Sequence, residues 1–274
     1  MSTYSEKSTK VQRLRVHHLT QAKQRGEKLV MLTAYDAVTA RILDAAGTDM
    51  LLVGDSIGNT MLGRENTLEV TLDEMAVATR AVASATTRAM VVADFPFGTY
   101  ESGPTQALAT GVRLLKAGAQ AVKLEGGATR AKSVKALTEA GIPVVGHLGF
   151  TPQSVNLLGG YRVQGRGEAG AQLLADAQAL QEAGAVALVI EMVPEPLAAE
   201  VTQTLSIPTI GIGAGAQVDG QVLVWTDMAG MTQWTPRFAA RFGEVGAQLE
   251  KAAASYGQAV RSGAFPDADH WFAK

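Results

Sequence analysis

Short apolar runs alternate with helical patterns along most of this chain, and this alternation limits the fold more than any other feature. Each run is bounded by turn residues, as interior strands are. Eight strands are predicted, at residues 29–35, 50–54, 90–94, 121–125, 143–148, 185–192, 209–213 and 221–225. Regular strand–helix alternation favours a parallel sheet, and eight strands favour a closed (β/α)8 TIM barrel. An open doubly wound sheet is the alternative.

Helical patterns fill most intervals between the predicted strands. They are expected at residues 38–46, 74–85, 105–117, 132–140, 173–183, 196–205 and 237–261, with Thr71 or Asp73 as the cap of the second. Four of them end in Ala-Gly before the next strand, which is typical of a helix that leads into a parallel strand. The Gly-rich segment 151–170 exceeds an ordinary connection of about 2–6 residues, so we expect a functional loop there.

The length of 274 residues fits one barrel, because a (β/α)8 domain typically needs roughly 250 residues. No linker rich in Pro, Ser or charge divides the chain. We therefore predict a single domain, residues 1–274, made of an N-terminal arm and helix (1–26), a barrel (27–230) and a C-terminal helical region (231–274). The arm carries several basic residues, and a basic arm leading into a polar helix is favoured over a transit peptide.

Composition excludes several classes of function. The 24 basic and 26 acidic residues leave a net charge of −2, so no field of one sign attracts nucleic acid or an anionic membrane. The chain has no cysteine for a disulfide, a zinc–thiolate site or a thiol nucleophile. Its apolar runs are shorter than the roughly 18 residues of a membrane span, and its start lacks the apolar core of a secretory signal. A cytoplasmic protein is expected.

Carboxylates stand where three of the apolar runs end, at Asp55, Asp94 and Glu125. Strand side chains alternate faces, so Val53 and Asp55 are predicted to share a face, as are Lys123 and Glu125. Catalytic groups of barrels come from the carboxyl ends of different strands. Three hard oxygen donors favour Mg²⁺ over zinc. For any one of them alone, a helix cap or a pair with a loop arginine is the alternative.

Three more polar residues occupy strand ends. Lys123 would neutralise a substrate carboxylate or form a Schiff base, and the electrostatic role is favoured because neighbouring carboxylates hold its proton. A structural Lys–Glu pair is the alternative. Glu191 ends a strongly apolar run, where desolvation would make it a useful general base; a salt bridge to Arg162 or Arg166 is the alternative. His147 is as compatible with a structural role as with a catalytic one.

Two glycine-rich stretches are less specific. Gly211–Gly215 resembles a phosphate-binding loop, but a strand rather than a helix is predicted after it, so a close approach of backbone to ligand is the better interpretation. The segment 159–166 lies in the long loop and would serve as a lid or as a flexible connection.

An ordered set of motifs resembles the ketopantoate hydroxymethyltransferase family. The matching stretches are Thr33-Ala34-Tyr35-Asp36, Val53-Gly54-Asp55-Ser56, Ala93-Asp94-Phe95-Pro96-Phe97, Lys123-Leu124-Glu125-Gly126-Gly127, Gly146-His147-Leu148-Gly149, Thr151-Pro152-Gln153-Ser154, Gly159 to Arg166, Gly211 to Gly215, and Asp219-Gly220-Gln221. Each stretch alone is weak, whereas the ordered set, from about residue 29 to 230, is highly specific. The segment 231–236 and the long basic arm depart from the expected pattern.

The resemblance implies a TIM barrel of the phosphoenolpyruvate mutase and isocitrate lyase type. It implies one Mg²⁺ per subunit, 5,10-methylenetetrahydrofolate as co-substrate, 3-methyl-2-oxobutanoate as the small-molecule acceptor, 2-dehydropantoate as product, and a homo-oligomer, a decamer of two pentameric rings. An enolate stabilised by Mg²⁺ would attack the folate-borne carbon. Carried onto this chain, the resemblance places Asp55, Asp94 and Glu125 around the metal, Asp55, Ser56, Asp94 and Lys123 on the keto acid, and Glu191 as the base, with His147 as an accessory candidate.

Three rival functions rank below this transferase. A Mg²⁺-dependent carbon–carbon lyase of the same superfamily is the nearest, although the lyases chosen for comparison use a loop cysteine that this chain lacks. A ring-forming scaffold without activity predicts a broken ligand set, whereas all the expected carboxylates and Lys123 are present. A nucleotide-binding module would rest on Gly211–Gly215 alone.

Overall fold

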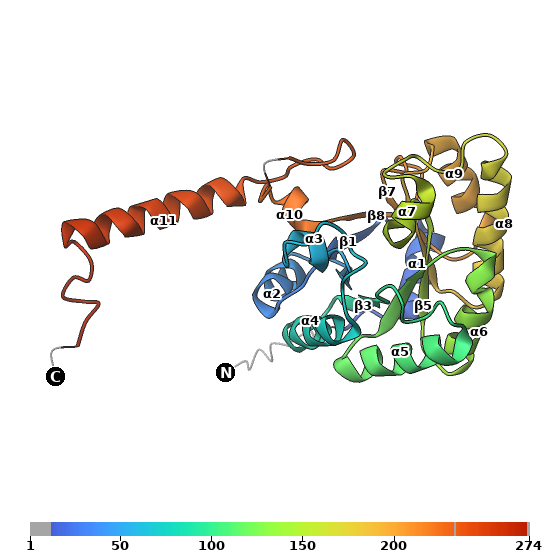
Figure 1. Cartoon of the computed structure of the whole chain (residues 1–274), viewed down its shortest axis with the longest axis horizontal. Helices are drawn as coiled ribbons and strands as arrows, with labels where there is room; N and C mark the ends of the chain where they lie inside the picture. Colours follow the sequence, from blue (N-terminus) through green and yellow to red (C-terminus); the bar gives the residue numbers. More distant parts are fainter. Residues whose placement is uncertain (1–11, 233, 273–274) are drawn as a thin grey trace, which may run out of the picture. The chain divides into compact units, whose positions relative to one another are not determined.

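A closed barrel of eight parallel strands is the main element of the fold (Figure 1). The computed structural model describes residues 12–232 and 234–272. The barrel follows chain order from β1 to β8, and β8 pairs with β1 to close it. The strands are β1 (Leu29–Thr33), β2 (Met50–Val53), β3 (Met90–Asp94), β4 (Ala121–Glu125), β5 (Val144–Gly149), β6 (Ala187–Glu191), β7 (Thr209–Ile212) and β8 (Gly220–Leu223). The predicted (β/α)8 barrel is confirmed, and the open sheet is excluded.

Helices connect most of these strands and lie outside the barrel (Figure 1). They are α2 (Ala37–Ala45), α3 (Ile57–Thr60), α4 (Leu72–Ala85), α5 (Pro104–Ala117), η1 (Ala128–Arg130), α6 (Ala131–Glu139), η2 (Pro152–Ser154), α7 (Val155–Leu158), α8 (Ala169–Glu182) and α9 (Glu195–Thr204). Local sequence explains several of their ends. Thr71 caps α4 by accepting the Glu74 N–H, and the Glu74 carboxylate accepts the Thr71 N–H in return.

The chain divides into two compact units, one ending at Leu223 and the other beginning at Val224. The first contains the barrel. The second contains the short helix α10 (Trp225–Met228) and the long helix α11 (Val245–Ser262). A single domain spanning the whole chain stays a prediction.

The barrel interior is filled by alternate residues of the strands, as a period of two requires. Met50 and Leu52 of β2, Met90 and Val92 of β3, and their counterparts on the other strands form one buried cluster. The same alternation carries Asp94, Lys123, Glu125, His147 and Glu191 into the interior at the carboxyl ends. Apolar side chains therefore fill the barrel interior toward the amino ends of the strands, and polar side chains fill the layer at the carboxyl ends.

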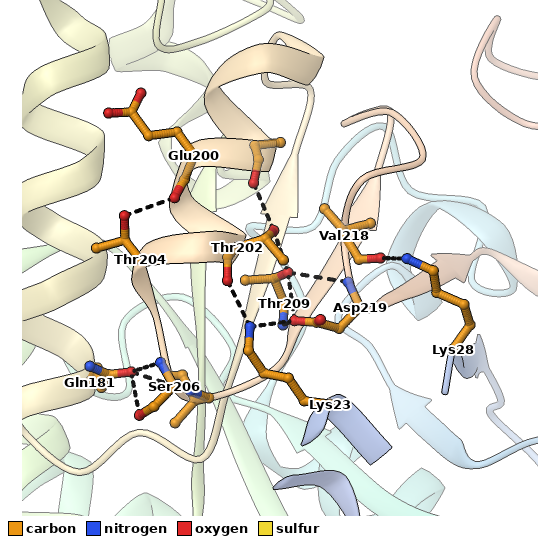
Figure 2. Close-up of polar contacts among 12 residues, drawn as sticks. Lys23, Lys28, Gln181, Glu200, Thr202, Thr204, Ser206, Thr209, Val218 and Asp219 are labelled. Atoms are coloured by element: carbon orange, nitrogen blue, oxygen red, sulfur yellow. Dashed lines mark hydrogen bonds and ion pairs between the residues drawn. The ribbon is translucent and has the colours of Figure 1, made fainter. Parts of the chain in front are cut away.

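Helix α1 (Val16–Arg25) closes the amino-terminal end of the barrel. Its buried Leu19 and Ala22 join the interior cluster, while Lys23 donates to the Thr202 carbonyl at 2.7 Å and to the Asp219 carboxylate at 2.8 Å. Asp219 also accepts from the backbone N–H of Thr209 at 2.9 Å. Figure 2 shows these contacts joining α1, α9, β7 and the residue before β8. The predicted helix after the basic arm is thus a plug for the barrel; residues 1–11 of that arm lie outside the described residues.

Three predicted boundaries are wrong. The last helix begins at Val245 rather than Arg237, because the N–H groups of Phe242 and Val245 donate to the carbonyls of Met228 and Ala229 instead of within a helix. Strand β8 ends at Leu223, and Trp225, predicted as strand, begins α10. The helix predicted to begin at Leu173 begins at Ala169, and the short helices η2 and α7 lie within the segment 151–170 before it.

Candidate active site

The strand register brings the predicted residues together at the carboxyl end of the barrel. Asp94 of β3 lies opposite Lys123 of β4, and Glu125 of β4 lies opposite His147 of β5. Gly149 at the end of β5 lies opposite Glu191 of β6. Neighbouring parallel strands lie about 4.8 Å apart, so side chains at matched positions on one face are within reach of each other.

Lys123 and Asp94 form a buried ion pair at the centre of this group. The Lys123 ammonium donates to both carboxylate oxygens of Asp94, at 2.7 and 2.8 Å, and both side chains are at most 5% exposed. Burial alone would lower the pKa of Lys123, but the surrounding carboxylates outweigh burial and raise this pKa. Lys123 therefore stays protonated, which favours the electrostatic role over Schiff-base chemistry.

Asp55 reaches the site by a route that strand alternation did not predict. Met50 and Leu52 face the barrel interior, so a regular strand would turn Asp55 outward with Val53. Strand β2 instead ends at Val53, and the chain turns at Gly54. The Asp55 N–H approaches Asp94 Oδ2 at 3.4 Å, and the buried Asp55 carboxylate has its pKa raised well above the usual value by burial and then by the nearby Asp94 and Glu125 charges.

Glu125 is 3% exposed, and only one of its two carboxylate oxygens has a hydrogen-bond partner among the described residues. Its Oε2 accepts the backbone N–H of Gln153 at 3.0 Å, while its buried Oε1 has no hydrogen-bond partner among the described residues. Burial raises the pKa of Glu125 to about 8, although the Lys123 charge acts in the opposite direction. A buried carboxylate oxygen without a partner is costly unless something else occupies its lone pairs.

His147 lies between two carboxylates. Its Nδ1 is 3.4 Å from Glu125 Oε1 and its Nε2 is 3.3 Å from Glu191 Oε2, although among the described residues neither nitrogen makes a well-aligned hydrogen bond. Burial and the Lys123 charge lower the pKa of His147, so the ring is neutral near pH 7. The sequence left a structural and a catalytic role open for His147. The structure shows a buried, neutral imidazole next to Glu191, the expected base.

Glu191 is the most exposed of these acids, with 16% of its side chain accessible. The next residue, Met192, has φ 49°, a left-handed conformation that side chains seldom adopt. Its N–H donates to the Ile212 carbonyl at 2.8 Å and its carbonyl accepts the Gln164 N–H at 2.9 Å, which ties the glycine-rich loop to the end of β6. No ion pair of Glu191 with Arg162 or Arg166 occurs in the described part of the chain.

Ser56 lies beside Asp55 in the turn that begins at Gly54, and it shares a hydrogen bond of 2.8 Å with the Tyr35 hydroxyl. Tyr35 is buried after β1, and burial raises the pKa of its hydroxyl. The Ser56 hydroxyl is therefore oriented by a neighbouring strand end rather than left free to rotate.

Sequence reasoning missed the roles of Gln153 and Tyr100. Gln153 begins no strand and follows Pro152 in the turn η2, yet its side-chain amide donates to Asp55 at 2.8 Å and accepts from the Tyr100 hydroxyl at 2.6 Å. The stretch Thr151–Ser154 is part of the family pattern, but nothing in local spacing indicates contacts with residues so distant in the chain.

The oxygen ligands of Asp55, Asp94 and Glu125 suit a divalent cation, but their side chains are not yet arranged around one position. Within residues 12–232 and 234–272, no group of three Asp, Glu or His side chains is already arranged to hold a metal ion. Asp94 faces Lys123 with both oxygens. The unpartnered Glu125 Oε1 and the raised pKa values of Asp55 and Glu125 nevertheless mark a site that gains by binding positive charge.

Comparison with known proteins identifies the family of this chain. A model of the ketopantoate hydroxymethyltransferase family matches residues 13–268. The chain belongs to this family. A 3-methyl-2-oxobutanoate hydroxymethyltransferase of Rhodococcus jostii is 56% identical over 94% of this chain and 90% of its own length, and one of Acidothermus cellulolyticus is 56% identical over 94% and 96%. One of Mycobacterium tuberculosis is 55% identical over 95% and 93%.

Solved structures with the same fold are more distant in sequence. A 2,3-dimethylmalate lyase, described as a member of the PEP mutase/isocitrate lyase superfamily, has a TM-score of 0.58 at 17% identity, covering 90% of this chain and 88% of its own. A phosphonopyruvate hydrolase in complex with oxalate and Mg²⁺ has a TM-score of 0.59 at 14% identity, covering 93% and 92%. These likenesses confirm the predicted type of barrel.

Two further sequence features are clarified. The stretch Gly211–Gly215 ends β7 and leads to β8 without an intervening helix, so it lacks the helix N-terminus that a nucleotide-binding loop requires. Among the residues that the structure describes, no helix is both long enough and apolar enough to cross a lipid bilayer.

Proposed function

We propose that this chain transfers a hydroxymethyl group from 5,10-methylenetetrahydrofolate to 3-methyl-2-oxobutanoate and forms 2-dehydropantoate. The observation that carries the proposal is a protonated, buried Lys123 surrounded by carboxylates, with a separate and more exposed carboxylate, Glu191, on the other side of His147. With a divalent cation bound, such a site would hold an anionic keto acid and place a base beside it. Family relatives carry the name of the same reaction.

The keto acid would be held by Asp55, Ser56, Asp94 and Lys123. The Lys123 ammonium supplies the positive charge that the substrate's oxygens need, and Ser56 supplies a hydroxyl already oriented by Tyr35. Because Lys123 is buried, its charge is screened little by water and acts strongly on an oxygen that becomes more negative.

Asp55, Asp94 and Glu125 would hold one Mg²⁺ per subunit, with Asp94 leaving its present contact with Lys123 at least in part. When bound, Mg²⁺ would polarise the keto group and so acidify the hydrogen on C3. Oxygen-only donors and the absence of cysteine from the sequence suit Mg²⁺.

Glu191 would accept the C3 proton. Its carboxylate lies at the mouth of the barrel, and His147 Nε2 at 3.3 Å limits its movement. Loss of the proton makes C3 nucleophilic. C3 then bonds to the methylene carbon as one of that carbon's two bonds to folate nitrogen breaks, and the second carbon–nitrogen bond is replaced by a bond to water oxygen. Atom balance requires one water, which supplies the hydroxyl oxygen of the product.

The half-reaction at Glu191 is testable without folate. Proton NMR of 3-methyl-2-oxobutanoate in D₂O should show deuterium entering C3 only with Mg²⁺, and Glu191→Gln should slow this exchange by about 10²–10⁴-fold. Glu195→Gln is the matched control, because this carboxylate four residues away is exposed and accepts the Ala216 N–H at 3.2 Å. Addition of 5,10-methylenetetrahydrofolate should then give 2-dehydropantoate.

Failure to form 2-dehydropantoate with every substrate present would overturn the transferase proposal. In that case a Mg²⁺-dependent carbon–carbon lyase would become the better candidate, and cleavage of 2,3-dimethylmalate would be assayed next. The sequence still lacks the loop cysteine expected of such lyases.

We further propose a homo-oligomer, with a decamer as the expected size. Helix α11 supports this, because none of its residues, all of them described, is buried, and Val245, Leu249, Tyr256 and Val260 form one exposed apolar stripe. Light scattering should give about ten times the mass of one chain, and Leu249→Asp should reduce it; a monomeric wild type would contradict the proposal. The cytoplasmic location stays a prediction.

A further inference from the structure

The side-chain amide of Gln153 is fully engaged by three residues from the segments that follow β2 and β3. Its Nε2 donates to Asp55 Oδ2 at 2.8 Å and to the Phe95 carbonyl at 2.7 Å, and its Oε1 accepts from the Tyr100 hydroxyl at 2.6 Å. Gln153 is 6% exposed. Both N–H donors of the amide and its carbonyl oxygen are thus used inside the protein.

Tyr100 decides which way this amide points. Burial raises the pKa of the Tyr100 hydroxyl, so the hydroxyl keeps its proton and donates a hydrogen bond to Gln153 Oε1. The reversed amide would place its oxygen against the Phe95 carbonyl oxygen, at the 2.7 Å now spanned by a hydrogen bond, and a carbonyl oxygen can only accept. Hydrogen-bond chemistry therefore fixes the amide with its NH₂ toward Asp55.

Tyr100 is itself held firmly. It is 2% exposed, its ring packs against Phe95 with centroids 5.7 Å apart, and the Arg130 guanidinium lies 5.3 Å from its ring centroid. The orienting hydroxyl thus has little freedom to move away from Gln153.

The backbone of Gln153 completes the arrangement. Its N–H donates to Glu125 Oε2 at 3.0 Å, in a turn closed by the bond from the Ser154 N–H to the Thr151 carbonyl. One residue therefore holds one oxygen of Asp55 and one oxygen of Glu125. The second oxygen of Glu125 stays without a hydrogen-bond partner among the described residues.

We propose that Gln153, oriented by Tyr100, is a positioning residue that presents the Asp55 and Glu125 carboxylates to a divalent cation. It acts through these two carboxylates rather than on the substrate. The inference rests on the proposed function, since that function supplies the metal.

The test is Mg²⁺ titration of the full-length protein by calorimetry, with thermal unfolding measured in EDTA. Gln153→Met should weaken Mg²⁺ binding by about 10–100-fold, as loss of an outer partner of metal ligands does. Tyr100→Phe keeps the ring and removes only the hydroxyl, so it should weaken binding by a smaller factor, about 3–10-fold. Should Gln153→Met fail to fold, Tyr100→Phe carries the test.

Gln120→Met is the matched control. Gln120 also uses both ends of a partly buried amide, accepting the Val91 N–H at 2.7 Å and donating to the Gly118 carbonyl at 3.1 Å, but it lies at the amino-terminal end of the barrel. Its loss should lower the unfolding temperature and leave Mg²⁺ affinity unchanged.

The outcomes separate this inference from the proposed function. Wild-type affinity in Gln153→Met, or in Tyr100→Phe if the first variant does not fold, would overturn the positioning role and leave the transferase proposal standing. An equal loss in Gln120→Met would also overturn it, because the effect would then follow general destabilisation. A wild-type protein that binds no Mg²⁺ would overturn both.

Discussion

The two ends of the barrel treat buried carboxylates in opposite ways. At the amino-terminal end, Asp44 accepts hydrogen bonds from the backbone N–H groups of Thr87, Arg88 and Ala89. Burial would raise its pKa, but these bonds outweigh burial and lower it. At the carboxyl end, burial and neighbouring charge raise the pKa values of Asp55 and Glu125.

The difference separates stability from function. Carboxylates supplied with donors, such as Asp44 and the Asp219 of Figure 2, join elements of the barrel together. Carboxylates crowded together with an unpartnered oxygen cost free energy until a cation or substrate arrives. This agrees with the general division of such barrels into a stabilising bottom and a catalytic top.

The largest effect on turnover should come from a substitution at the carboxyl end of the barrel. Glu191→Gln removes the proposed base but leaves the core intact, so turnover should fall by about 10²–10⁴-fold. The free energy of unfolding should change by less than about 0.5 kcal/mol, because the side chain is partly exposed. Steady-state kinetics and urea unfolding measure the two quantities. A large loss of stability in Glu191→Gln would contradict the proposed difference between the two ends of the barrel.

The bottom should show the reverse. Asp44→Asn exchanges an acceptor of several N–H groups for an amide that presents donors to them, and should cost about 2–3 kcal/mol of unfolding free energy. Turnover per folded molecule should stay at the wild-type level. Urea unfolding at pH 7 checks the first statement, and kinetics below the unfolding temperature check the second; lost turnover in the folded variant would contradict the division.

Glu125→Gln tests whether the crowded carboxylates at the carboxyl end of the barrel destabilise the protein when no metal is bound. In metal-free protein the folded-state pKa of about 8 exceeds the ordinary value, so the folded state holds a proton that the unfolded state lacks between about pH 4.5 and 8. Wild-type stability should therefore fall as pH rises through this window. The variant should show a weaker pH dependence, because only the raised pKa of Asp55 remains, and it should be more stable than the wild type at pH 8 by about 1–2 kcal/mol.

Urea unfolding in EDTA at pH 6 and pH 8 provides the measurement, with Glu195→Gln as a control that should keep the wild-type pH dependence. Identical pH profiles for Glu125→Gln and wild type would show that Glu125 carries no such proton. Mg²⁺ binding by the variant should be weakened at both pH values.

The smallest effect is expected at the α1 contact. Lys23→Met removes two hydrogen bonds but leaves Asp219 with its bond from Thr209, and both charged side chains are 16% exposed. The cost should be about 1 kcal/mol. Thermal unfolding with and without 0.5 M salt measures it, because a screened ion pair should lose part of the difference in salt; a change in turnover is not expected.

Part of the site follows directly from the sequence. Asp94, Glu125 and Glu191 end strands whose apolar runs are easily recognised, and Lys123 lies two residues before Glu125. A period of two places all four side chains inside the barrel with the core residues. The eight strands follow from the same runs, and Thr71 was predictable as a cap from its own side chain and Glu74. The family follows from the ordered motifs. All of these depend on neighbours in the chain.

Other features depend on neighbours in space, and only the tertiary structure decided them. Alternation grouped Asp55 with Val53, but the turn after β2 brings Asp55 inward to meet Gln153. The start of α11 was missed because hydrogen bonds to Met228 and Ala229 replace the first helical turns. The pattern of apolar residues specifies strands and faces, whereas the partner of a buried amide is fixed only when barrel closure brings distant strand ends together.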